Sequence, residues 1–171
     1  MDLRAVTSQI SSKQEINALV SKVNHDPKLI KQIVSFTDDP DKRLAYYATW
    51  VLSTISDDAM YLIEPHFQCL AELLDRAESD GIRRNILRIF SQTPIPPSLQ
   101  ENLANTCFQI MESNQQPVAH QVFAMTVLAN ITENIPELKN DLIVLIEDKL
   151  PFASAGFQSR GKKILKTLKN L

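Results

Sequence analysis

The chain has 171 residues, of which 44% are hydrophobic and 22% charged, and its formal net charge is −2. These values are typical of an ordered globular chain, so we expect a single domain over residues 1–171 and not a disordered one. With three glycines and two cysteines, the sequence offers no phosphate-binding glycine loop and no metal-ligand pattern, so we expect no cofactor and no metal.

Nowhere do 18 apolar residues follow one another, so we expect no membrane span and no membrane partner, and we assign the chain to the cytoplasm. The two cysteines, Cys69 and Cys107, lie within apolar patterns of helical spacing. Both are therefore expected to be small buried side chains in a reducing compartment.

The N-terminal region is expected to cap the fold. Residues 1–11 have little periodicity and are expected to be either frayed or a short leading helix. Ser12 and Glu15 then have the spacing of a capping box, and apolar residues follow at helical intervals. This pattern predicts a helix from about 13 to 24 within a capping segment at 12–25.

A repeat begins after this segment. Four prolines, each followed two residues later by a large apolar residue, lie 38, 32 and 39 residues apart: Pro27, Pro65, Pro97 and Pro136. Each interval contains two apolar stretches of helical spacing separated by a turn signal, which is typical of a helix-turn-helix unit that must stack on its neighbours. The predicted repeats cover about 27–56, 57–93, 96–131 and 136–171.

Acidic residues mark the predicted turns. Asp39 before Pro40, the pair Asp57 and Asp58, and Ser79 before Asp80 are each expected to cap the helix that follows. In the second repeat we expect a long first helix, bent at Pro65 because proline cannot donate a hydrogen bond inside a helix.

This layout resembles the HEAT and armadillo-like repeat families. The resemblance implies an all-α, right-handed α-α superhelix of about four helix pairs plus an N-terminal capping helix. It also implies a non-catalytic scaffold for protein partners. A tetratricopeptide array fits less well because its signature residues and constant period are absent, and a plain helical bundle stays open.

The charges are distributed unevenly along the repeats. The predicted second helices (40–56, 80–93, 116–131 and 154–171) contain ten Lys and Arg against two Asp. Since second helices line the concave surface in HEAT-like arrays, the resemblance implies a basic concave face and an acidic outer face. The alternative is a simply solvated surface, because five of the ten cations lie in the last helix and segment 116–131 has none.

The candidate binding residues are the cations and aromatics of these second helices. Three arginines on one short helix suit bidentate recognition of carboxylate or phosphate, and aromatic residues beside cations can hold a partner side chain. The predicted partner-binding set is Arg43, Tyr47, Trp50, Arg83, Arg84, Arg88, Arg160 and Lys163.

Two kinds of partner are consistent with this set. We expect an acidic protein segment, because nucleic-acid-binding proteins usually have a basic total charge. The alternative is a nucleic-acid-binding module or a relative of the HEAT-like DNA-repair glycosylases, although no motif places a catalytic aspartate beside Trp50. An enzyme is the less favoured reading, and the sequence leaves the oligomeric state open.

Overall fold

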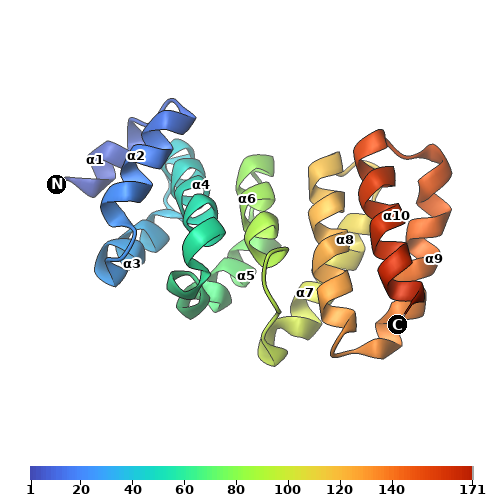
Figure 1. Cartoon of the computed structure of the whole chain (residues 1–171). Helices are drawn as coiled ribbons and strands as arrows, with labels where there is room; N and C mark the ends of the chain where they lie inside the picture. Colours follow the sequence, from blue (N-terminus) through green and yellow to red (C-terminus); the bar gives the residue numbers. More distant parts are fainter. Residues whose placement is uncertain (171) are drawn as a thin grey trace. The chain divides into compact units, whose positions relative to one another are not determined.

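The computed structural model describes residues 1–170, and within them every regular element is helical (Figure 1). The α-helices are α1 (Leu3–Ser8), α2 (Lys13–Val23), α3 (Pro27–Phe36), α4 (Lys42–Ala59), α5 (Phe67–Arg76), α6 (Asp80–Phe90), α7 (Pro97–Glu112), α8 (Val118–Thr132), α9 (Lys139–Lys149) and α10 (Ala155–Lys169). Short 3-10 helices are η1 (Met60–Leu62), η2 (Glu64–His66), η3 (Pro136–Leu138) and η4 (Leu150–Phe152). The prediction of an all-α fold is confirmed.

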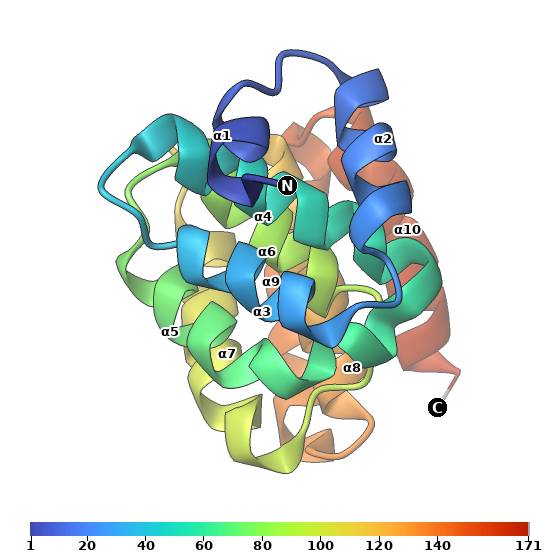
Figure 2. The same cartoon turned by 90° about the vertical axis from the view of Figure 1, so that its left-hand side faces the viewer.

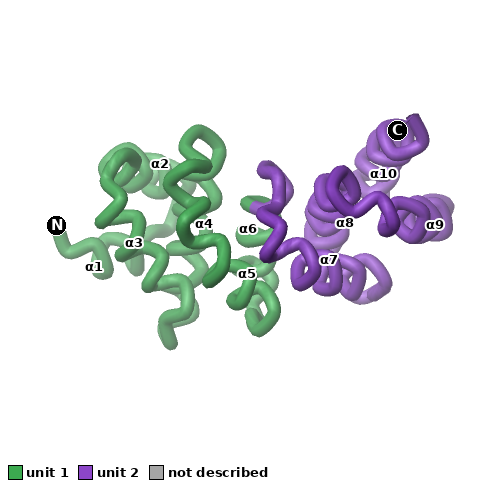
Figure 3. Tube along the Cα trace, turned by 90° about the horizontal axis from the view of Figure 1, so that it is seen from below, with its two compact units in different colours: residues 1–89 green, residues 90–171 purple. Residues whose placement is uncertain are grey.

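The chain forms two compact units, residues 1–89 and 90–171 (Figure 3). Unit 1 contains α1 to α6, whose last residue lies just past the boundary, and unit 2 contains α7 to α10.

The four repeat-marking prolines all lie where the first helix of a pair begins. Pro27 and Pro97 are the first residues of α3 and α7. Pro65 and Pro136 lie in the 3-10 helices that lead directly into α5 and α9. Proline suits all four positions because the backbone N–H groups in the first turn of a helix have no partner within the helix, and because the fixed φ of proline is close to the helical value.

Of the two expectations for residues 1–11, the short leading helix is the one found. Residues 3–8 form α1, which Asp2 caps through a hydrogen bond from the Ala5 N–H, and Leu3 and Thr7 are buried. The predicted capping box of Ser12 and Glu15 is present at the start of α2. α1 packs on α3 and α4, and α2 packs along α4, so both helices cap the first of the predicted helix pairs (Figure 2).

Three predictions about the turns were wrong. Asp41, and not Asp39, caps α4, while the Asp39 carboxylate accepts from Arg4 and from the Asp41 N–H. Asp57 and Asp58 lie inside the last turns of α4, which continues to Ala59. The first helix of the second predicted repeat is not long and bent: two 3-10 turns around Pro65 precede a ten-residue α5.

The cores of both units consist of aliphatic side chains between paired helices. In unit 1, Ile30, Leu52, Leu70 and other apolar residues are fully buried, and in unit 2 Cys107 is buried as predicted. The prediction for Cys69 was wrong, because it lies on the exposed side of α5, where its thiol donates to the carbonyl oxygen of His66. Partial burial still raises the pKa of the Cys69 thiol.

Candidate functional site

The exposed face of α4 carries a cation and two aromatic side chains from the predicted set. Arg43, Tyr47 and Trp50 lie three to four residues apart, so they share one side of the helix. The Arg43 guanidinium lies 5.1 Å from the centre of the Tyr47 ring, and the Tyr47 and Trp50 rings are stacked with centroids 6.1 Å apart. Both aromatic residues are half-buried, so each keeps part of its ring accessible to a partner.

Arg43 also joins α4 to the connection between α1 and α2. Its Nε donates to the Ser8 carbonyl oxygen at 3.0 Å, and its Nη2 donates to the Ile10 carbonyl oxygen at 2.7 Å. These carbonyls belong to the connection between α1 and α2. The guanidinium therefore donates to the carbonyl oxygens of this connection while it lies over the Tyr47 ring.

Gly81 lets α6 approach α4 closely. A Cβ atom at this position would lie 2.5 Å from Cε2 of Tyr46, a ring that also contacts Tyr47 edge-on. The absence of a side chain at Gly81 thus fixes where the Tyr46 ring lies, and with it the aromatic cluster of Tyr46, Tyr47 and Trp50.

We predict that Gly81→Ala lowers the free energy of unfolding by about 1 kcal/mol, because displacing the Tyr46 ring costs more than alanine returns in helix propensity. Urea unfolding of the single and double variants measures this. In a Tyr46→Ala background the same change should be neutral or stabilising. Equal effects of Gly81→Ala in both backgrounds would contradict the steric account.

Polar side chains C-terminal to Gly81 also connect α6 to α4. Asn85 is buried and donates to the Thr49 hydroxyl at 3.1 Å. Arg88 Nη1 donates to the Ser53 carbonyl oxygen at 2.8 Å and to the Ser53 hydroxyl at 3.0 Å, and its Nη2 pairs with the Asp57 carboxylate at 2.7 Å. Arg88 is therefore a structural contact as well as a predicted binding residue.

Arg83 and Arg84 differ from Arg88. Arg84 is exposed, and among residues 1–170 it makes no ion pair. It lies between Gly81 and Arg88, both of which contact α4, so helical spacing places it on the exposed side of α6 near α4. Arg83 is half-buried, and its Nε is buried without a hydrogen-bond partner in the described part of the chain.

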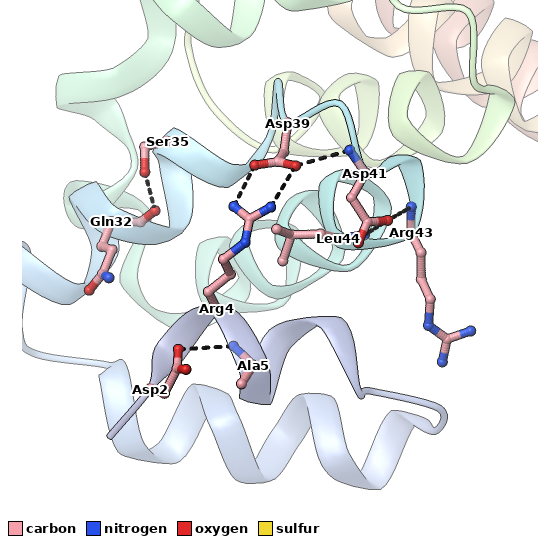
Figure 4. Close-up of polar contacts among 9 residues, drawn as sticks. All are labelled: Asp2, Arg4, Ala5, Gln32, Ser35, Asp39, Asp41, Arg43 and Leu44. Atoms are coloured by element: carbon pink, nitrogen blue, oxygen red, sulfur yellow. Dashed lines mark hydrogen bonds and ion pairs between the residues drawn. The ribbon is translucent and has the colours of Figure 1, made fainter.

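Ties between residues about one repeat apart recur elsewhere. Arg4 makes a bidentate pair with Asp39 at 2.6 and 3.0 Å (Figure 4). Arg76 pairs with Asp38 at 2.5 Å. In unit 2, Lys149 at the end of α9 donates to the Ser113 carbonyl oxygen at 3.3 Å, and burial lowers its pKa. Each of these cations thus binds the turn inside a neighbouring helix pair: Arg76 and Lys149 bind the pair before their own, and Arg4 of α1 binds the later turn between α3 and α4.

The pair of Arg4 and Asp39 makes stability depend on pH. The hydrogen bond from Arg4 holds the pKa of the Asp39 carboxyl below its ordinary value. A lowered folded pKa stabilises the fold above the unfolded pKa of about 4, and this contribution is lost as the pH falls through the folded value.

We therefore predict that wild type is more stable than Asp39→Asn at pH 7 and that the difference shrinks steadily below about pH 4. Urea unfolding followed by circular dichroism at a series of pH values measures this. A stability difference that stays constant down to the lowest pH would contradict the assigned ion pair.

Unit 2 brings Arg160 and Lys163 together on the exposed side of α10. Both line a groove of about 140 Å³ between α8 and α10, opposite Thr126 and Asn130. Both are exposed, and neither makes an ion pair within residues 1–170. Glu133 at the end of α8 lines the same groove.

The structure thus places six of the predicted residues in unit 1 and two in unit 2. Sequence reasoning missed the partners of Arg43 and Arg88, which are the Ser8 and Ile10 carbonyls, Ser53 and Asp57. It also missed the neighbouring contact between Asn85 and Thr49. The residues that make these contacts are 31 to 36 positions apart in sequence, which is close to the repeat length. A search for polar pairs at that spacing could have found them.

Residues 1–170 contain neither a cluster of metal-ligating side chains nor a membrane-spanning helix. No group of three or more His, Cys, Asp or Glu side chains there could hold a metal ion. Among the same residues, every helix is too short or too polar to span a bilayer. The cytoplasmic assignment stays a prediction.

Paired helices of this length, joined by short turns and by polar contacts one repeat apart, define an α-helical repeat protein of the solenoid class. The HEAT repeat domain family matches residues 3–168, so the chain belongs to this family. The predicted family resemblance is confirmed.

Solved structures show the same fold. One crystal structure of an engineered protein aligns with a TM-score of 0.66 at 15% identity, over 98% of this chain and 79% of that one. A second engineered protein aligns with a TM-score of 0.65 at 16% identity, over 98% of this chain and 42% of that one. No curated protein matches the sequence.

Proposed function

We propose that unit 1 binds an acidic segment of another protein on the exposed faces of α4 and α6. The observation that carries this proposal is the contrast between Arg84 and its neighbours. Arg43 and Arg88 are engaged by carbonyls and a carboxylate, whereas Arg84 is exposed without an ion pair in the described chain. Arg84 would therefore offer its full set of donors to a partner carboxylate.

The aromatic cluster supports the same partner. Tyr47 and Trp50 are partly exposed, stacked rings on α4, the helix that Arg88 of α6 contacts, and rings of this kind supply contact area at low entropic cost. Arg83, with its desolvated Nε, is a second donor on α6. In unit 2, Arg160 and Lys163 form a separate cationic surface for the same class of ligand.

A protein partner fits these charges better than a nucleic acid does. The chain carries 18 Lys and Arg against 20 Asp and Glu, and few of the basic residues on α4 and α6 are unpaired. A phosphate backbone is usually tracked by many free cations, whereas a short acidic segment needs only a few. The stacked pair of Tyr47 and Trp50 favours single-stranded nucleic acid as the second candidate, because exposed rings can stack on bases.

Fluorescence anisotropy with two labelled probes tests the proposal. The probes are a flexible peptide of Asp, Glu, Gly and Ser, and a single-stranded oligonucleotide. We expect the peptide to bind and to lose at least about tenfold in affinity when Arg83→Glu and Arg84→Glu are combined. The matched control is Lys28→Glu, a charge reversal at an exposed site in the first turn of α3.

The outcomes separate the two candidates. Tight oligonucleotide binding that falls steeply with added salt, with no peptide binding, would replace the acidic-protein proposal by the nucleic-acid one. Peptide binding that is equally strong in the charge-reversed variant would place the ligand elsewhere on the chain.

A further inference from the structure

The exposed side of α8 is unusual for a second helix because it is uncharged. No Lys, Arg, Asp or Glu occurs from Val118 to Thr132. Val118, Val122, Thr126 and Ala129 follow one another at intervals of four, four and three residues, which places them in one line along the helix. Val118 is 45% exposed and the other three are partly exposed, so we call these four residues the α8 stripe.

The side chains of the α8 stripe favour contact with an apolar surface of a ligand. The Thr126 hydroxyl already donates to the Val122 carbonyl oxygen at 3.0 Å, so it needs no polar group from a ligand. Gly156, the second residue of α10, lies near Val118, because a Cβ added there would lie 4.0 Å from Cγ1 of the valine. The start of α10 thus lies within van der Waals reach of Val118 without covering it, since Val118 is 45% exposed.

The neighbouring helix α10 carries the complementary charge. It contains five Lys and Arg and no Asp or Glu. Lys169 pairs with Glu147 of α9. Arg160 and Lys163 instead line the groove against α8, beside Thr126 and Ala129 of the stripe. An apolar line and a cationic line therefore run next to each other on the same face of unit 2.

We infer that this face of unit 2 binds an amphipathic, acidic α-helix of a partner protein. Such a helix presents apolar side chains every three to four residues, which matches the spacing of the α8 stripe. Carboxylates on its flank would meet Arg160 and Lys163. The inference rests on the proposed function and narrows it, because an extended acidic segment would use the cations and leave the stripe uncovered.

Competing ligands would use the same cations. A phosphate backbone or an anionic lipid surface would bind α10 through charge alone, and neither has a row of apolar side chains spaced to fit α8. Dependence on the stripe is thus the property that distinguishes a helical partner from the others.

The test uses the full chain and two labelled peptides of identical Leu and Glu composition, one ordered as an amphipathic helix and one scrambled. We expect the amphipathic peptide to bind at least about tenfold more tightly by anisotropy, and Val122→Asp to remove most of that advantage. Val118→Asp serves as a second stripe variant at the more exposed end. Circular dichroism confirms that each variant is folded.

Charge variants complete the design. Arg160→Glu combined with Lys163→Glu should weaken the amphipathic peptide at least about tenfold. The matched control is Lys162→Glu, an equally exposed cation on α10 that does not line the groove, and its effect should be much smaller.

Three results would overturn the inference: equal affinity for the two peptides, full binding by folded Val118→Asp and Val122→Asp, or binding of an oligonucleotide or phosphatidylserine vesicles in place of the peptide. If the scrambled peptide binds as well as the ordered one and depends on Arg84, the proposed function survives and only the helical partner fails. If neither peptide binds, the helical partner fails, and the flexible peptide of Asp, Glu, Gly and Ser decides the proposed function separately.

Discussion

Arg88→Ala is expected to lower the free energy of unfolding by about 2 kcal/mol, because it removes charged hydrogen bonds that join α4 to α6. The Ser53 carbonyl oxygen and hydroxyl would each lose a donor, and the Asp57 carboxylate would lose its cation. Ser53 is buried, so water would replace these bonds only in part. Urea unfolding at pH 7 measures the change.

Arg84→Ala is the matched control for this loss of stability. Arg84 has the same charge and lies on the same helix one turn away, but it is exposed and has no ion pair in the described chain. We expect its stability to stay within about 0.5 kcal/mol of wild type, as for most surface substitutions. Similar losses in the two variants would contradict the distinction between a structural and an available arginine.

Trp50→Ala and Arg84→Glu are each expected to weaken binding of an acidic peptide at least about tenfold, with little change in stability for Arg84→Glu. Trp50→Ala would remove the ring surface that contacts the ligand. Arg84→Glu would replace a cation with a carboxylate that repels the carboxylates of the peptide. Anisotropy titrations with the flexible acidic peptide measure both effects.

The control for this binding pair is Tyr61→Ala. Tyr61 is 60% exposed in η1, outside α4 and α6, so its removal tests whether any exposed aromatic matters. Its affinity should equal that of wild type. If Trp50→Ala and Arg84→Glu bind the peptide as tightly as this control, the surface on α4 and α6 is not the binding site.

Much of the fold follows from local sequence rules. Prolines at the start of first helices and the capping box of Ser12 and Glu15 act within a few residues, so the sequence alone predicts them correctly. The role of Asp39 could not be predicted in this way. Its partner Arg4 is 35 residues distant in sequence, and Asp41 is the residue that caps α4.

The candidate site shows the same limit. Counting charges by helix found the arginines, but it could not separate those that tie repeats together from those that are available. That separation depends on whether carbonyls and carboxylates of the preceding pair lie within reach. Arg88 has Ser53 and Asp57 beside it, whereas Arg84 points to the exposed side.

The most direct measurement of the central claim uses Trp50, the single tryptophan of the chain, as an intrinsic fluorescent probe. Titration with an unlabelled acidic peptide should change Trp50 emission saturably, with the same midpoint as the anisotropy curve, and Arg84→Glu should remove the change. Binding seen by anisotropy with no change in Trp50 emission would contradict the claim that α4 and α6 form the site.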